Sequence, residues 1–441
     1  MNTNTKRAGT LKKLCLGLSY AFSYAYICLF SETTGMNSLC ITIFLTLLSL
    51  GAILWLELSM RQQQLLGKFT PSRFQKYETR FWEAILILLS ISTFAGETQA
   101  MSLFFIHMVV IYMALTGTGH LLSDRSSCLM PVDMINGMFC LPLISFFSRI
   151  LAIGELFHPE DEPVEVMLPD GTTVVGQKVK RKPGYQVAII GVLIIIAGFF
   201  FAAISNLASV DSHFSDAADS IVKFFDNVSF SDSIGRFILS LPVGAFLFGL
   251  FQGCVKKDIS TEKTLHDKIV SVSPRLRFMP DAVLSTVLLL FSALYVTFFV
   301  SQASYMFSAF AGVLPEAFTA SEYAVSGFHE LINVVLINFA LLATVRIFGS
   351  HDSRLLRALS VILMVESMVF ATISASKIIL YMSRFGYTIS RTLGLWGTSV
   401  VFAGSILAIF YLLKGRKAFA PWLWYSAGSY VIMAFITWIF A

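Results

Sequence analysis

The chain has 441 residues, of which 56% are hydrophobic and 13% charged, and its formal net charge is +5. Soluble domains carry about 25% charged residues, so this composition excludes an ordinary soluble protein. The apolar residues come in runs of about 18 or more, the length that a helix needs to cross a bilayer. We therefore predict an all-α fold, a polytopic transmembrane helix bundle. Lys and Arg accumulate in short cytoplasmic loops of such proteins, so the positive charge does not indicate nucleic-acid binding.

The apolar runs predict about eleven membrane-spanning helices. They cover residues 13–30, 38–59, 81–96, 100–118, 186–206, 233–253, 282–308, 322–346, 357–382, 393–413 and 420–440. The basic clusters at 6–13, 60–80 and 254–280 all fall on one side of this arrangement. Because cytoplasmic loops carry the excess of Lys and Arg, we expect a cytosolic N-terminus and a C-terminus outside.

Residues 134–152 do not fit this alternation. They are apolar enough to span, but a crossing there would place Lys178, Lys180 and Arg181 outside and invert every later loop. We therefore predict a re-entrant or interfacial helix, interrupted at Pro142 because proline lacks the N–H that continues a helix.

The substantial polar insertion is residues 154–185. Two β-rich stretches flank Pro169-Asp170-Gly171 there, a pattern typical of a β-hairpin. We expect this hairpin in the cytosol, either as a solvated connector or as the docking surface of a cytosolic partner. The chain then divides into N-terminal membrane helices (1–153), the insertion (154–185) and a C-terminal membrane bundle (186–441).

Ionisable residues inside two of the predicted spans are the main candidates for function. Tyr323, Ser326, Glu330 and Asn333 lie three and four residues apart, and so share one helix face. An ionisable side chain at the bilayer centre costs about 2.5–3.5 kcal/mol and usually faces a partner or a cavity. We expect Glu330 to pair with Lys377, or to share a polar cavity with it, in the outer half of the bilayer. In the alternative, Glu330 bonds its own neighbours and Lys377 extends toward the surface.

Glu366 lies on the same face as Lys377, because eleven residues make almost three whole helical turns. The two are about 16 Å apart along the axis, too far to pair. Such a polar line is either the pathway of a proton- or ion-coupled transporter or a set of interhelical contacts. Gln302 and Tyr305 either join the same cavity or pack against neighbouring helices.

Arg384 and Arg391 flank a turn that the charge pattern places outside. Two arginines there oppose the positive-inside bias, so an anionic group is expected to compensate them. An anionic lipid headgroup or substrate would do so, and so would the acidic 211–232 segment.

No cofactor and no metal site is predicted. His329-Glu330 and Asn333 fall one histidine short of a zinc-protease pattern, and the six cysteines include no Cys-x-x-Cys. Gly117-Thr118-Gly119 lacks the lysine and hydroxyl context of a phosphate-binding loop.

Four groups of residues resemble a bacterial integral-membrane family known as domain of unknown function 4173, close kin of 4153. They are Val210-Asp211 with Phe214; Tyr295, Phe299, Gln302, Tyr305 and Phe307; Pro315 through Leu331; and Lys377, Tyr381, Gly386, Thr388 and Arg391. The sequence departs from the family at Lys377, where the family usually has Arg, and at Val325-Ser326, which replace Arg-Arg. The resemblance implies a bacterial cytoplasmic (inner) membrane location and the same helical architecture. It implies no reaction.

These features favour a permease-like function, the handling of a small or amphipathic solute through an outward-facing polar cavity, and make an enzyme the less favoured class. Ten residues are candidates for the solute or ion pathway: Gln302, Tyr305, Tyr323, Glu330, Asn333, Glu366, Lys377, Tyr381, Arg384 and Arg391. Expected partners are the lipid bilayer and an anionic lipid or amphipathic solute. One alternative is a membrane-embedded transferase or polymerase that acts on a lipid-linked substrate, with Glu330 as general base. Another is an accessory or sensor subunit without transport activity.

Overall fold

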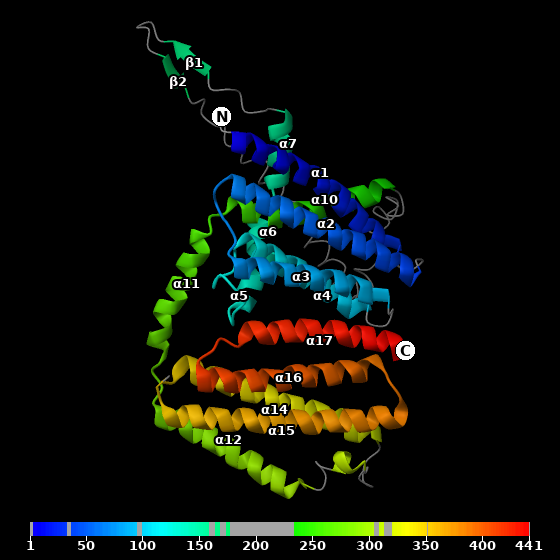
Figure 1. Cartoon of the computed structure of the whole chain (residues 1–441), viewed down its shortest axis with the longest axis vertical. Helices are drawn as coiled ribbons and strands as arrows, with labels where there is room; N and C mark the ends of the chain where they lie inside the picture. The colour runs from blue at the N-terminus through cyan, green and yellow to red at the C-terminus, as the bar shows by residue number, and fades with distance from the viewer. Residues whose placement is uncertain are drawn as a thin grey trace, which may run out of the picture. The chain divides into compact units, whose positions relative to one another are not determined.

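A computed structural model describes residues 3–32, 37–94, 99–157, 164–167, 173–176, 233–303, 308–312, 320–350 and 352–440. The helices and strands in chain order are α1 Thr3–Glu32, α2 Ser38–Leu65, α3 Arg73–Ser92, α4 Gln99–Thr118, α5 Met130–Ile135, η2 Asn136–Cys140, α6 Leu141–Ile144, α7 Ser148–Phe157, β1 Val164–Met167, β2 Thr173–Gly176, α10 Ser233–Lys256, α11 Ser260–Val272, η3 Ser273–Leu276, α12 Asp281–Ser301, η4 Ser308–Ala311, α14 Ala320–Phe348, α15 Arg354–Phe385, α16 Ile389–Lys414 and α17 Phe419–Phe440. The described part is therefore almost entirely helical (Figure 1).

The chain forms two compact units. Unit 1 comprises Met1–Thr79, Val110–His120 and Val132–Asp258, and unit 2 comprises Arg80–Val109, Leu121–Pro131 and Ile259–Ala441. Each unit has its own buried core.

In unit 1, α10 packs against α1, α2, α6 and α7. The fully buried ring of Trp55 on α2 stacks on Phe251 of α10, with ring centroids 4.9 Å apart. Gly249 and Gly253 bring α10 close to α6: a Cβ at Gly249 would lie 2.7 Å from the carbonyl oxygen of Pro142. Small residues four apart allow this close backbone approach between membrane helices.

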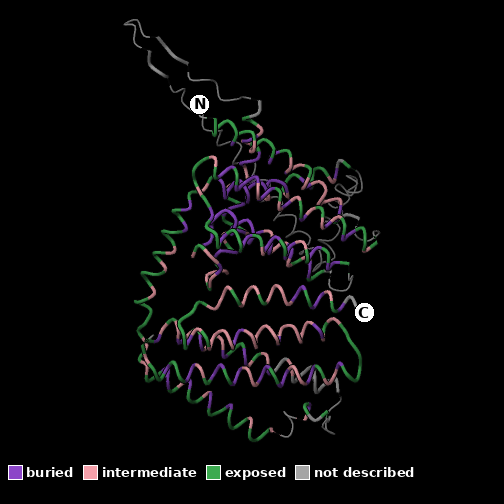
Figure 2. The backbone as a smooth tube through the Cα atoms, in the orientation of Figure 1, coloured by how far each residue is buried: buried purple, intermediate pink, exposed green. Residues whose placement is uncertain are grey.

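In unit 2, α14 and α16 both pack on α15, α12 packs on α15, and α17 packs on α16 (Figure 1). The core between them includes Leu288, Val335, Leu363 and Phe370. Figure 2 shows buried positions recurring along α15, while α12 turns mostly exposed residues outward. Those residues are apolar, with Leu289, Leu290, Leu294, Val296 and Val300 all more than half exposed. An apolar outer face around polar interior groups is the arrangement expected of a protein in lipid.

Nine described helices are long and apolar enough to cross a membrane, or ten if one bent pair counts as a single span. They correspond to the predicted spans except for 81–96 and 186–206. The first corresponds to α3, which begins at Arg73 and carries charged residues through Glu83. Its apolar part is therefore too short for α3 to count among the nine candidate spans. The second lies outside the described residues.

The structure corrects three predictions about local structure. The first helix begins at Thr3, so the basic residues from Lys6 to Lys13 belong to it rather than precede it. The 254–280 segment, expected to be a loop, contains the thirteen-residue helix α11. Helix α12 ends at Ser301, whereas the prediction carried it to 308.

The 134–152 segment is helical and broken, but the break is not at Pro142. Residues Met130–Ile144 are helical without interruption, and Ser148–Glu155 follow at a bend of 43°. Pro142 is the second residue of α6, which begins at Leu141 immediately after the π-helical turn η2, where the altered hydrogen-bond ladder accommodates the proline ring and its missing N–H.

Strands β1 and β2 pair antiparallel in the 154–185 insertion, with Val166 opposite Val174. They are the two strands in the described part of the chain. Which side of the membrane they occupy stays a prediction.

Candidate functional site

Helix α15 carries the candidate site in unit 2. Its N-terminus is capped by Ser353, whose hydroxyl oxygen accepts a hydrogen bond from the backbone N–H of Leu356. The polar residues Ser360, Glu366, Ser367, Ser374 and Lys377 are all buried along it. Since their neighbours on α12 and α14 are largely apolar, each must find a polar contact inside the bundle or remain without one.

Glu366 is turned toward a neighbouring helix. It is 7% exposed, and its Oε2 accepts a hydrogen bond of 3.1 Å from the hydroxyl of Ser292 on α12. The carboxylate is therefore not satisfied within its own helix, as the sequence reasoning expected of a carboxylate in hydrocarbon.

A chain of neutral groups continues beside Glu366. The hydroxyl of Tyr295 on α12 donates to Oδ1 of Asn338 on α14 over 2.7 Å, and Nδ2 of Asn338 donates to Ser367 over 2.9 Å. Ser367 in turn donates to the carbonyl of Leu363. We call Ser292, Tyr295, Asn338, Glu366 and Ser367 the three-helix polar network.

Aromatic and aliphatic side chains enclose this network. The Tyr295 ring meets Phe370 edge to face at 5.1 Å and Phe291 at 6.0 Å. Asn338 and Ser367 are completely buried. In such a low-dielectric setting hydrogen bonds are electrostatically stronger, and an unpaired polar group is costly.

Toward the C-terminal end of α15 the polar line continues with Ser374 and Lys377. Lys377 is only 1% exposed, whereas an extension toward the surface would expose its ammonium group. The hydroxyl of Ser374 is buried and has no hydrogen-bond partner among the described residues. Glu330 lies within α14, but its side chain falls outside the described part, so the Glu330–Lys377 pair stays a prediction.

The two arginines at this end are held by backbone carbonyls. Nη2 of Arg384 donates to Gly312, and Nη1 of Arg391 donates to Phe385 and Gly386. The guanidinium of Arg391 also lies 4.0 Å from the ring centre of Tyr381. Carbonyls and a ring face leave the positive charge in place, so both arginines can still attract an anion. The acidic 211–232 segment lies outside the described residues.

The remaining candidates lie either outside the network or outside the described residues. Gln302 follows α12 and is exposed, and Asn333 is exposed on α14. Tyr305 lies outside the described residues, and so does the side chain of Tyr323. The described residues contain no cluster of three or more His, Cys, Asp or Glu that could hold a metal ion.

Sequence reasoning found Glu366 but missed the polar groups around it. Tyr295 entered only through the family resemblance, and Ser292, Asn338 and Ser367 were not singled out. Asn338 had a usable signal, since it is an amide within the 322–346 apolar run and such side chains usually hydrogen-bond across helices.

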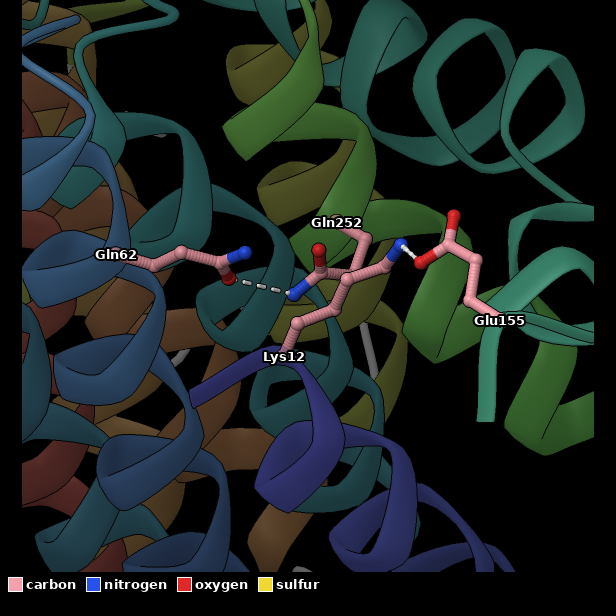
Figure 3. Close-up of polar contacts among 4 residues, drawn as sticks. All are labelled: Lys12, Gln62, Glu155 and Gln252. Atoms are coloured by element: carbon pink, nitrogen blue, oxygen red, sulfur yellow. Dashed lines mark hydrogen bonds and ion pairs between the residues drawn. The ribbon is translucent and has the colours of Figure 1, made fainter. Parts of the chain in front are cut away.

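Unit 1 holds a second set of polar contacts, of which the Gln62–Gln252 hydrogen bond is buried and the Lys12–Glu155 pair is exposed (Figure 3). Nε2 of Gln252 on α10 donates to Oε1 of Gln62 on α2 over 3.0 Å, and Lys12 of α1 pairs with Glu155 of α7. Gln63 donates to the carbonyl of Cys254 over 2.9 Å.

Two more side chains reach the same end of α10. His120 is hydrogen-bonded to the Cys254 carbonyl over 2.7 Å, and Lys68 donates to the carbonyls of Val255 and Lys256. These side chains satisfy carbonyls that the end of a helix leaves open, so they account for the stability of α10 rather than for a reaction.

The comparisons with known proteins identify a family and no characterised relative. Residues 83–441 match the family described as Domain of unknown function (DUF4153). No curated protein and no solved structure is significantly similar to the chain. The match confirms the related family, while the number 4173 stays a prediction. Because residues 83–441 are well over half of its length, the chain belongs to the DUF4153 family.

Proposed function

We propose that this protein is a permease that moves small or amphipathic anions across the membrane, with α12, α14 and α15 lining its pathway. The observation that carries the proposal is the buried Glu366, whose carboxylate bonds across to Ser292 on another helix. An ionisable residue placed inside a membrane bundle is most often part of a substrate, ion or proton path.

The neutral groups of the three-helix polar network favour a transport pathway over the alternative, in which the polar residues of α15 serve only as contacts between helices. Tyr295, Asn338 and Ser367 already join the three helices by neutral hydrogen bonds. Contacts between the helices therefore do not require a carboxylate, which costs more to place in hydrocarbon than an amide or a hydroxyl. Ser374, whose hydroxyl has no hydrogen-bond partner within the ranges that the structure describes, extends the line toward Lys377. An unpaired buried hydroxyl is explained if water or solute visits this position.

In this mechanism each group has a role that follows from its place on α15. Arg384 and Arg391 attract the anion at the mouth, because their charges are not cancelled by the carbonyls they contact. Lys377, paired with Glu330, gates the passage. Glu366 is the inner relay, about 16 Å further along the helix, where it takes up or releases a proton as the anion passes.

We also propose the membrane arrangement that the charge pattern indicates. The nine helices, together with 81–96 and 186–206, make eleven spans of a bacterial cytoplasmic membrane. The N-terminus and the β1–β2 hairpin are then cytosolic and the C-terminus is outside, as the positive-inside bias favours. The hairpin is free in this arrangement to dock a cytosolic partner.

The test is uptake into proteoliposomes. The purified full chain is reconstituted with an internal pH indicator and exposed to a panel of monocarboxylates and amphipathic anions. We expect at least one anion to enter together with protons, and Glu366→Gln to lower the rate by about tenfold or more, since a side chain that relays protons contributes on the order of 10²–10⁴. The matched control is Asp352→Asn, which removes an exposed carboxylate that precedes α15 and leaves uptake unchanged. Liposomes with the wild-type chain that admit no anion faster than empty ones, or equal rates for Glu366→Gln, contradict the proposal.

A further inference from the structure

Arg149 is a buried cation in unit 1. It lies in the first turn of α7 and is 2% exposed. Its Nη1 donates to the carbonyl of Leu241 on α10 over 2.9 Å, and its Cζ lies 3.6 Å from the ring centre of Tyr20 on α1. The carbonyl and the ring face hold the guanidinium in place but do not neutralise it.

The opposite edge of this guanidinium has no hydrogen-bond partner among the described residues. Nε and Nη2 are buried and form no hydrogen bond with any part of the chain that the structure describes. These two N–H groups are parallel donors on one side of the planar group, the geometry that accepts two oxygens of a carboxylate or phosphate at once. The hydroxyl of the preceding residue, Ser148, is also buried and has no hydrogen-bond partner in the described part of the chain.

The backbone of α10 is shaped around the guanidinium. A Cβ at Gly244 would lie 2.4 Å from Nη1 and 2.7 Å from Cζ of Arg149. Only glycine leaves room for the cation at this point, so the buried position of Arg149 depends on the α10 sequence as well as on α7.

The site lies deep in the membrane-spanning part of unit 1. Tyr20 is eight residues beyond Lys12 and ten before Phe30 in the span of α1, distances of about 12 and 15 Å along the helix. Glu155, which pairs with Lys12, lies six residues after Arg149 on α7. Helix α7 therefore runs antiparallel to α1, with one polar contact near its C-terminal end and the cation at depth.

We propose that Arg149 binds a monoanionic oxyanion group, a carboxylate or a phosphodiester, on its Nε/Nη2 edge, with Ser148 as an additional donor. Burying an isolated charge is strongly unfavourable unless it is paired, and an anion removes that penalty. A group with a single negative charge balances the one guanidinium, whereas a phosphate dianion would leave a buried excess charge. The N-terminus of α7 also favours an anion, because it is the positive end of the helix dipole.

The segment before Arg149 allows the anion to enter. The helix breaks between Ile144 and Ser148, and the two parts meet at 43°. In the proposed site, the anion reaches the guanidinium by an opening of α7 at this break.

Two probes distinguish the sources of this anion: dioleoylphosphatidylglycerol, which offers a phosphodiester, and decanoate, which offers a carboxylate. Each is titrated into the purified full chain in dodecyl maltoside, and binding is followed by native mass spectrometry for the lipid and by the shift in unfolding temperature for decanoate. We expect one equivalent of one probe to bind the wild-type chain, and Arg149→Lys to bind it at least tenfold more weakly. Lysine keeps the charge but lacks the paired donors, so general attraction to the protein's net charge does not explain such a loss.

The matched control is Glu155→Gln, which removes the other polar contact between α1 and α7 and should keep wild-type affinity. Gly244→Ala is a second variant, because its Cβ displaces the guanidinium while Arg149 remains, and it should lose affinity as Arg149→Lys does. Lipid binding alone assigns a phosphodiester ligand, and decanoate binding alone assigns a carboxylate. A wild-type chain that binds neither probe, or Arg149→Lys that binds as tightly as the wild type, overturns the proposal.

If both variants fail to fold, a cryo-EM map of the wild-type chain with the bound probe decides. Density against Nε and Nη2 of Arg149 supports the site, and density elsewhere overturns it.

Discussion

Tyr295→Phe tests whether the three-helix polar network stabilises unit 2. The substitution removes only the hydroxyl that donates to Oδ1 of Asn338 over 2.7 Å, and it keeps the ring against Phe370. Asn338 is completely buried, so its oxygen then has no donor and water does not replace it. Hydrogen bonds between membrane helices average about 0.6 kcal/mol, with a maximum near 1.7, and a buried unsatisfied acceptor costs about 1–3 kcal/mol. We therefore expect the free energy of unfolding to fall by about 1–2 kcal/mol.

A double-mutant cycle with Asn338→Leu isolates the contact. Each single variant should destabilise the protein, and the pair should lose less than the sum, with a coupling of about 1 kcal/mol because residues that share a hydrogen bond are not additive. The assay is reversible unfolding in mixed micelles of dodecyl maltoside and sodium dodecyl sulfate. Tyr425→Phe is the matched control, since Tyr425 is substantially exposed on α17, and its effect should stay within about 0.5 kcal/mol. A coupling near zero, or equal effects of the two Tyr→Phe changes, would refute the reasoning.

Three further predictions concern stability in the same micelle assay. Glu366→Gln keeps an acceptor for Ser292 and removes a buried charge, so stability should be unchanged or higher; a loss above about 2 kcal/mol would instead assign the carboxylate a structural role. Gly249→Ala should destabilise the protein by about 1–2 kcal/mol, since its Cβ would lie 2.7 Å from a backbone oxygen. Gly428→Ala, in open space, is the control and should leave stability unchanged or raise it. A change in stability of the same sign for both Gly→Ala substitutions would contradict the packing of α6 on α10. Gln63→Leu and His120→Leu each remove a hydrogen bond to the Cys254 carbonyl. Because the two side chains share one acceptor, the double variant should lose more stability than the sum of the single losses, and simple additivity would show that they act independently.

The positions of the C-terminal helices could be predicted from the sequence. Long apolar runs at 357–382, 393–413 and 420–440 correspond to α15, α16 and α17 within a few residues, because a span must bury a fixed length of apolar chain. The same criterion failed where polar residues are helical, as in α11 and the first turns of α1 and α3. Hydropathy reports burial in lipid, and it does not report whether a polar segment at the end of a span is helical.

The candidate site could be predicted in part, for a related reason. A carboxylate or an ammonium within an apolar run stands out, and the structure buries both Glu366 and Lys377. The partners of Glu366 could not be predicted, since the contact between Ser292 and Glu366 joins residues 74 positions apart. A serine in a membrane helix usually bonds its own backbone, as Ser367 does with Leu363. The packing of the helices decides between that bond and one to a neighbouring helix. The spacing of residues in one sequence does not reveal this packing.

The most direct test of the account is the reactivity of a cysteine placed at Ser374 in a chain whose six native cysteines are replaced by serine or alanine. A water-soluble methanethiosulfonate reagent is added to oriented vesicles from each side in turn, and the control is a cysteine at Ile379, on the exposed apolar face of the same helix. Because a thiol reacts as the thiolate, it needs contact with water. A pathway along α15 predicts that the cysteine at Ser374 reacts and the one at Ile379 does not. If the cysteine at Ser374 is as inert as the control from both sides, the polar line is closed to water and the permease proposal is wrong.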